Sequence, residues 1–199
     1  MTLANKITFA RIGLIPIFLG ALMYYQASVR DGAPDEIFRW IAVGAFLTAA
    51  LSDALDGFIA RCFNQHSYLG SILDPVADKG LVLSALISLS WMDVPGLFRI
   101  PIWFLVLVLT RDVVLIVGYC ILHLTGERVK ISAHGLGKTA TFLMMTALSA
   151  ILLKLPMDWC QAFVILSGVF TLLSIVVYLR RGVELFGQFQ LLPPEDTRK

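Results

Sequence analysis

Charged residues are scarce in this sequence. Asp, Glu, Lys and Arg make up 15% of the 199 residues, whereas 58% are hydrophobic. A soluble domain carries about 25% charged residues, so the composition excludes an ordinary soluble fold. The mean hydropathy is +0.81, and several apolar runs reach the length of about 20 residues that a helix needs to span a bilayer. The sequence therefore predicts an α-helical integral membrane protein.

Cysteine is also scarce, and no internal repeat is present. Cys62, Cys120 and Cys160 are odd in number, are scattered and form no CxxC pair. This excludes a disulfide framework and predicts buried, reduced thiols. The net charge of +2 is too small to indicate a nucleic-acid partner. We expect a single membrane domain over residues 1–199.

The apolar runs and their breaks predict six transmembrane helices. They cover residues 7–26, 38–59, 70–91, 100–124, 136–155 and 159–179. A polar tail follows over about residues 180–199, and its first part, "VYLRRGVELF", is expected to lie as an amphipathic segment in the membrane interface. Flanking basic residues predominate on the side of both termini and of the connection between the second and third helices. That side is predicted to be cytoplasmic.

The stretch "SDALDGFIARCFNQHSYLGSILDPVADKG", residues 52–80, collects four aspartates at this connection. Asp53 and Asp56 are three residues apart and Asp74 and Asp78 four, so each pair shares one face of its helix. Without partners, four such carboxylates would repel one another or take up protons. Divalent cations resolve this conflict, because carboxylate oxygens are ligands for Mg²⁺, Mn²⁺ or Ca²⁺.

Four carboxylates can hold two ions, and a two-metal site suits phosphoryl transfer. Gly57 lets a ligand approach the backbone, Arg61 offers a planar fork for a phosphate, and Pro75 is compatible with the first turn of the third helix. Structural aspartates and an ion-conducting protein are the alternatives. The carboxylates cluster at one helix junction and are not spread along a path, which favours a metal–diphosphate site at the membrane surface.

At these positions the sequence resembles a known family. Asp53-x2-Asp56-Gly57-x2-Ala60-Arg61-x8-Gly70-x3-Asp74-x3-Asp78 is similar to the signature of the CDP-alcohol phosphatidyltransferases. The segments "LANKITFARIGLIPIF", "LDPVADK" and "HGLGKTATF" also look like this family. The resemblance implies a six-helix membrane fold, often dimeric, with its active site facing the cytoplasm. It also implies phospholipid synthesis in the inner membrane of a bacterium, with both termini cytoplasmic.

The resemblance implies a role for each motif position. Two Mg²⁺ or Mn²⁺ ions would be bound by Asp53, Asp56 and Asp74, with Asp78 close to the second ion. Asp78 would also act as the general base that takes the proton of the acceptor alcohol. The CDP moiety of CDP-diacylglycerol would be bound by Asp53, Gly57, Ala60, Arg61 and Gly70.

The acceptor alcohol depends on finer similarities. "LANKITFARIGLIPIF" and "LDPVADK" are similar to bacterial phosphatidylglycerol-phosphate synthases, which transfer the phosphatidyl group to glycerol 3-phosphate and release CMP. Such an acceptor needs cationic ligands, and the candidates are Arg111, Arg128, Lys130 and Lys138. Arg111 lies within an apolar run, where a charge is costly unless it faces a polar cavity. The alternative is that Arg111 pairs with Asp112 or with a motif carboxylate.

Other segments resemble a different member of the same family. "TRDVVLIVG" and "GKTATF" are similar to cardiolipin synthases, whose acceptor is phosphatidylglycerol. Arg111-Asp112 stands where phosphatidylglycerol-phosphate synthases more often have Arg-Glu.

Lys79, directly after Asp78, would either reach a phosphate or extend to the membrane interface.

Overall fold

Every regular element that the structure describes is an α-helix. The structure is a computed structural model; it describes residues 3–63, 68–124 and 135–191, with side chains over 9–52, 79–118, 120, 135–180 and 182. Along this part of the chain the six helices are α1 (Leu3–Arg30), α2 (Glu36–Phe63), α3 (Tyr68–Trp91), α4 (Ile102–Leu124), α5 (Gly135–Leu152) and α6 (Met157–Leu191). The predicted all-α class and all six predicted helices are confirmed.

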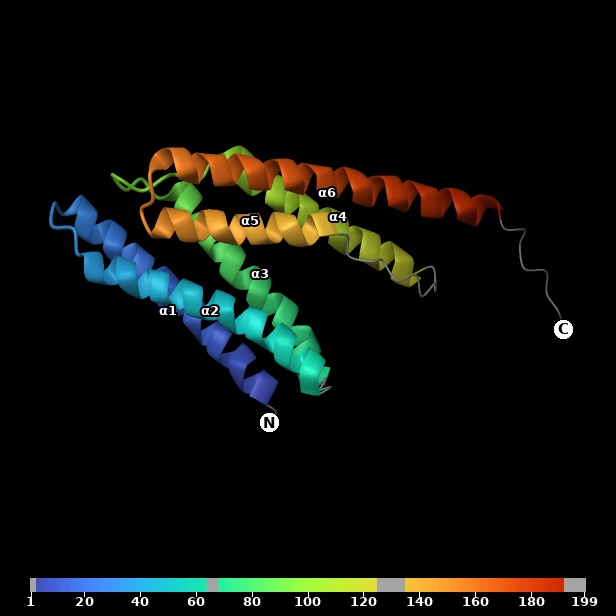
Figure 1. The fold of residues 1–199 in the computed structure, drawn as a ribbon, viewed down its shortest axis with the longest axis horizontal. Helices are drawn as coiled ribbons and strands as arrows, with labels where there is room; N and C mark the ends of the chain where they lie inside the picture. The colour runs from blue at the N-terminus through green and yellow to red at the C-terminus, as the bar shows by residue number, and fades with distance from the viewer. Residues whose placement is uncertain (1–2, 64–67, 125–134, 192–199) are drawn as a thin grey trace.

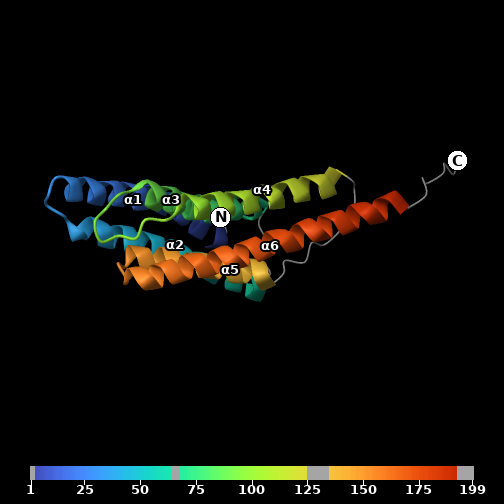
Figure 2. The same cartoon turned by 90° about the horizontal axis from the view of Figure 1, so that it is seen from above.

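The helices form two groups of three. In the first group, α1 packs along α2 and α3, and in the second α6 packs along α5 and α4. The groups meet where α5 contacts α2 and where α3 contacts α4. Figure 1 shows α1 beside α2, α5 beside α6, and α3 crossing from the first group toward the second. Figure 2 shows α4 and α6 extending furthest toward the C-terminal end.

The chain runs up and down through the bundle. The α1–α2, α3–α4 and α5–α6 connections lie at one end, on the left of Figure 1, and the start of α1 and the ends of α2, α4 and α6 lie at the other. We call these the connection end and the motif end. The start of α1 and the end of α6 therefore lie at the same end of the bundle as the end of α2 and the start of α3.

Among the described residues, three helical segments are long and apolar enough to cross a membrane by length and composition. They are Phe9–Arg30, Gly135–Leu152 and Met157–Arg180, and Lys79–Trp91 is a shorter apolar segment. Because lipid is as apolar as leucine, helices in a bilayer associate through close packing more than through the hydrophobic effect. One such contact lies between α4 and α6, where a Cβ on Gly168 would stand 3.0 Å from the ring of Trp103.

The four tryptophans lie at one end of the molecule. Trp40 is near the start of α2, Trp91 ends α3, and Trp103 and Trp159 are near the starts of α4 and α6. All four are exposed, and all are at the connection end. Tryptophan concentrates where membrane meets water, and four exposed tryptophans at this end are the pattern expected of one bilayer interface.

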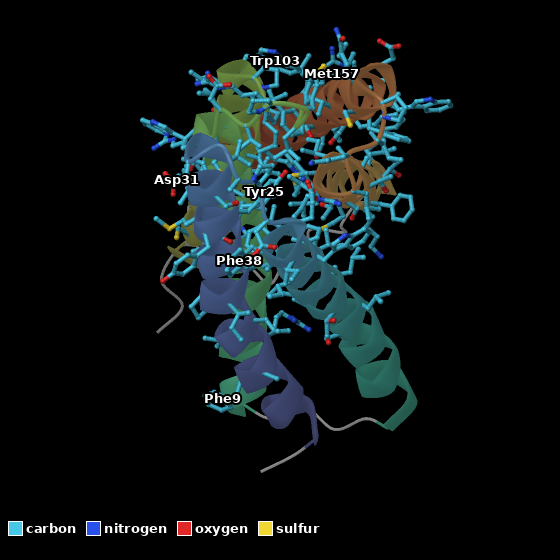
Figure 3. All side chains as sticks on the ribbon, turned by 90° about the vertical axis from the view of Figure 1, so that its left-hand side faces the viewer. Phe9, Tyr25, Asp31, Phe38, Trp103 and Met157 are labelled. Carbon is cyan, nitrogen blue, oxygen red and sulfur yellow. The ribbon has the colours of Figure 1, made fainter. Side chains whose placement is uncertain are left out.

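A charged cluster joins α1, α2 and the α5–α6 connection at the connection end. Lys154 Nζ lies 2.6 Å from Glu36 Oε1 and Arg39 Nε donates to Glu36 Oε2, while Tyr25 Oη donates to Glu36 Oε1 at 3.3 Å. Arg39 Nη1 also donates to the carbonyl of Leu152 at 2.9 Å. Figure 3 looks onto this end, with Tyr25 toward the centre and Asp31 on the outside. We call Tyr25, Glu36, Arg39 and Lys154 the charge clamp.

The clamp perturbs its carboxylate. Hydrogen bonds from Lys154 and Arg39 lower the pKa of Glu36 from 4.5 to about 2. Lys154 has a φ of +56°, a left-handed conformation that is uncommon outside glycine. The ion pair between Lys154 and Glu36 joins two residues that are 118 positions apart in the chain.

Three expectations from the sequence need correction. α3 begins at Tyr68, so Pro75 lies more than one turn inside the helix and not in its first turn. α6 continues without a break to Leu191, so "VYLRRGVELF" prolongs this helix and does not form a segment separate from it. Cys160 is buried as expected, but Cys120 is exposed on α4; the side chain of Cys62 is outside the described residues.

Candidate active site

The aspartate motif occupies the last turns of α2 and the first turns of α3. Asp53 lies ten residues before the end of α2, and Asp78 lies ten residues after the start of α3, which is about 15 Å along each helix. Asp56 and Asp74 are nearer to the junction by about the same amount. The two pairs thus lie at matching distances from the motif end of two neighbouring helices.

The remaining motif positions lie on the same two helices. Gly57, Ala60 and Arg61 follow on α2, and Gly70 is in the first turn of α3. The side chains of all the motif residues, the four aspartates included, are outside the described residues. All eight positions lie at the motif end of the bundle, and their roles stay predictions.

Lys79, the first described side chain after the motif, connects α3 to α4. Its Nζ lies 3.4 Å from Asp112 Oδ2. On α1, Ile15 Cδ1 would be 3.2 Å from a Cβ on Gly80, so α1 and α3 approach closely just beyond the motif. Directly after the motif, α3 is therefore in contact with α1 on one side and α4 on another.

Arg11 on α1 is a residue that the sequence-based interpretation missed. Its position near the start of the first apolar run is that of a basic residue flanking a span, but its side chain is only 1% exposed. Arg11 precedes Ile15 by one helical turn, and α1 and α3 both begin at the motif end. Because Ile15 faces Gly80, Arg11 lies at the level of α3 between Asp74 and Asp78. An arginine within the apolar run "TFARIGLIPIF" is the signal that could have revealed it.

Arg111 is buried inside the second group of helices. It is 8% exposed, and its Nη2 donates to the carbonyl of Gly137 at 3.0 Å, while its Nη1 donates to Thr141 Oγ1 at 3.3 Å. Both partners are neutral. Among the described residues Arg111 forms no ion pair with Asp112, whose partner is Lys79. A pair with a motif carboxylate falls outside the described side chains.

Gly137 lies close to α6 as well as to Arg111. A Cβ on Gly137 would stand 2.9 Å from Tyr178 Oη, 3.3 Å from Arg111 Nη2 and 3.7 Å from Ser174 Oγ. Ser174 is 2% exposed. We call Arg111, Gly137, Thr141, Ser174 and Tyr178 the Arg111 cluster. The sequence-based interpretation named only Arg111 among them, although the spacing of Ser174 and Tyr178, one turn apart in an apolar helix, indicates a shared polar face.

Only one of the two predicted acceptor lysines lies within the described residues. Lys138 is exposed on the first turn of α5, directly after the glycine that Arg111 binds. It therefore lies beside the Arg111 cluster at the motif end. Lys130 is outside the described residues.

Comparison with known proteins identifies the family. A model of the CDP-alcohol phosphatidyltransferase family matches residues 1–179. The chain is 33% identical over 189 residues to a probable phosphatidylglycerophosphate synthase of Mycobacterium tuberculosis H37Rv, which covers 93% of this chain and 83% of the relative. It is 36% identical over 160 residues to the CDP-diacylglycerol–glycerol-3-phosphate 3-phosphatidyltransferase of Bacillus subtilis, covering 78% and 79%.

Similarity extends to a second activity within the family. The chain is 32% identical over 168 residues to a CMP-forming cardiolipin synthase of Streptomyces coelicolor, covering 84% of this chain and 73% of the relative. No solved structure gives a significant match. The family match spans both helices of the aspartate motif and the Arg111 cluster as far as Leu179, so this chain belongs to the CDP-alcohol phosphatidyltransferase family.

Proposed function

We propose that this enzyme transfers the phosphatidyl group of CDP-diacylglycerol to glycerol 3-phosphate, forming phosphatidylglycerol phosphate and CMP. Relatives named for this reaction, from Bacillus subtilis, Haemophilus influenzae and Escherichia coli, are 29–36% identical to it over 78–87% of its length. The observation that carries the choice of acceptor is the buried Arg111, whose described partners are neutral. A small phosphorylated alcohol would supply an anion, which none of the described side chains supplies to this guanidinium.

The donor set of the motif fits divalent cations. Four carboxylates from two neighbouring helices, at matching distances from the motif end, are hard oxygen ligands of the kind that Mg²⁺ and Mn²⁺ prefer. Asp53, Asp56, Asp74 and Asp78 would hold two such ions. When bound, the ions would supply positive charge opposite the diphosphate and the departing CMP.

The residues of the chain would then position two substrates and move one proton. Arg61 would bind the diphosphate of the donor, and Gly57 would leave room for the CDP moiety against the helix backbone. Arg111, with Lys138 and Lys130, would bind the phosphate of the acceptor. Asp78 would take the proton of the acceptor hydroxyl. At the same time the hydroxyl oxygen would bond to the phosphorus that carries diacylglycerol, and the bond from that phosphorus to CMP would break. Positioning and charge carry such a step.

Transfer to phosphatidylglycerol is the second candidate. It is favoured by the similarity to cardiolipin synthases, which includes 42% identity over 116 residues to the human enzyme. Its acceptor is a lipid that would enter from the bilayer, and its phosphate is a diester. Both candidates share the donor half of the reaction.

The deciding experiment is CMP release by the purified protein in detergent with CDP-diacylglycerol, Mg²⁺ or Mn²⁺, and either glycerol 3-phosphate or phosphatidylglycerol. We expect turnover with glycerol 3-phosphate. Turnover with phosphatidylglycerol alone would make the second candidate correct. No CMP with either acceptor, from folded metal-loaded protein, would reject both.

A matched pair of variants tests the proposed base. Asp78→Asn should lower kcat by about 10²- to 10⁴-fold, as expected for loss of a general base, while the protein still binds CDP. Asp93→Asn makes the same change at an exposed aspartate at the connection end and should keep wild-type activity. Wild-type turnover by Asp78→Asn would remove Asp78 from its role.

The motif end is proposed to face the cytoplasm, on the basis of its flanking basic residues. A cysteine introduced at Asp31, in a variant without other cysteines, should react with a membrane-impermeant maleimide in spheroplasts. One introduced at Lys138 should react only after permeabilisation. The opposite pattern would invert the topology.

A homodimer is also proposed, with the exposed apolar side chains of α4 and α6 available for contact with lipid or a second copy.

A further inference from the structure

Two buried polar atoms beside Gly137 lack a hydrogen-bond partner in the described part of the chain. They are Arg111 Nε and Ser174 Oγ. Arg111 is 8% exposed and Ser174 2% exposed, so water does not readily replace the missing partners. Native proteins satisfy nearly all their buried polar atoms, and two exceptions in one cluster call for an explanation.

The other hydroxyls on the same face of α6 do not share this feature. Ser167 Oγ donates to the carbonyl of Ala140 on α5 at 3.2 Å, and Thr171 Oγ1 donates to the carbonyl of Ser167 at 2.8 Å. Both residues are as deeply buried as Ser174. The helix therefore satisfies its hydroxyls until it reaches the level of Arg111, where Ser174 is left without a partner.

The chemistry of the cluster selects an oxyanion. Its one charged group is a guanidinium, whose described partners are a carbonyl and a hydroxyl. Ser174 and Tyr178 add hydroxyl groups, which can donate to an anionic oxygen, and hydrogen bonds to a charged group are stronger than those between neutral groups. A phosphate that reached this cluster would find a positive charge and hydroxyl donors from a second helix.

We infer that α6 contributes Ser174 and Tyr178 to the acceptor subsite, where their hydroxyls and Arg111 together bind the phosphate of the acceptor alcohol. This inference rests on the proposed function, because it assigns residues to its acceptor. Gly137 is the spacer of this subsite. A Cβ there would stand 2.9 Å from Tyr178 Oη and 3.3 Å from Arg111 Nη2, so any larger residue would push these groups out of place.

Ser174→Ala and Tyr178→Phe each remove only a hydroxyl. Loss of a hydrogen bond to a charged ligand should raise the KM for the acceptor about tenfold or more. The KM for CDP-diacylglycerol should stay unchanged, which a merely structural role would not ensure. Ser174→Thr keeps a hydroxyl and should restore most of the acceptor affinity.

Thr171→Val is the matched control, because it removes a hydroxyl one turn away on the same buried face that is already bonded within α6. It should leave the acceptor KM at the wild-type value. An equal rise in acceptor KM for Thr171→Val and Ser174→Ala would assign the effect to helix packing and overturn the inference.

Calorimetric titration of the purified protein with glycerol 3-phosphate, beside the CMP assay with each acceptor, separates this inference from the proposed function. Ser174-dependent binding without CMP release from glycerol 3-phosphate would reject the proposed function and support the subsite. Normal turnover of glycerol 3-phosphate with an unchanged KM in Ser174→Ala and Tyr178→Phe would support the proposed function and overturn the inference. If only phosphatidylglycerol is used and its KM rises in both variants, the bound phosphate belongs to a lipid headgroup. Absence of any Ser174-dependent binding or KM change overturns the inference.

Discussion

Removal of the carboxylate at the centre of the charge clamp should destabilise the protein by a predictable amount. The pKa of Glu36 is lowered from 4.5 to about 2, and a full shift of that size corresponds to roughly 3 kcal/mol. The Glu36 side chain is 45% exposed, so solvent screening reduces its contribution. We expect Glu36→Gln to lose about 1–2 kcal/mol, which lowers the Tm of a chain of this size by about 2–8 °C.

The lowered pKa of Glu36 also predicts how the stabilisation changes with pH. A carboxylate whose folded pKa is lowered stabilises the protein above its unfolded pKa, and this contribution is lost as the pH falls toward the folded value. The Tm difference between wild type and Glu36→Gln should therefore be constant from pH 7 to 5 and should shrink between pH 4.5 and 2. Thermal unfolding in detergent, followed by circular dichroism at a fixed scan rate, measures it.

Asp31→Asn is the control for the clamp. It removes an exposed carboxylate only a few residues away, and it should leave the Tm within about 1 °C of the wild type because exposed charges contribute little. Two results would refute the reasoning: equal Tm values for wild type and Glu36→Gln at pH 7, or a difference between them that does not decline below pH 4.5.

Three further predictions concern the packing and charge of α4. Arg111→Met should raise the KM for glycerol 3-phosphate by tenfold or more in the CMP assay, with less effect on the KM for CDP-diacylglycerol, because it removes the cation of the acceptor subsite. Gly168→Val should lower the Tm, since overpacking against the ring of Trp103 costs about 1–3 kcal/mol, and Gly168→Ala should cost less. Asp112→Asn should change stability by less than about 1 kcal/mol, because its partner Lys79 is 42% exposed; a larger loss would mean that this ion pair is essential for packing.

The helices and their order could be predicted because each depends on a local property of the chain. An apolar run of about 20 residues must become a helix in a bilayer, since only internal hydrogen bonds satisfy its backbone there. Six such runs place both termini on one side. Helix ends were less predictable: α6 continues past Arg180 to Leu191, because polarity ends a membrane span without breaking a helix.

The site could be predicted only in part, for a related reason. The aspartate motif is local, with its positions on the two sides of a single helix junction. The contacts around Arg111 and Glu36 are not local: Arg111 binds Gly137, 26 residues away, and Lys154 binds Glu36, 118 residues away. Nothing in a hydropathy pattern specifies which face of α6 meets Arg111, so Ser174 and Tyr178 could not be assigned from sequence.

Two buried arginines that take part in these non-local contacts differ in how their charge is paired. Arg39 and Arg111 are almost equally buried, at 7% and 8% exposed, and a buried charge is costly unless it is paired. Arg39 is paired within the protein, with the carboxylate of Glu36 and the carbonyl of Leu152. Arg111, among the described side chains, has only neutral oxygens and an unbonded Nε. At the connection end the charge of Arg39 is neutralised by Glu36, whereas at the motif end none of the described side chains supplies an anion to Arg111, as the proposed acceptor subsite requires.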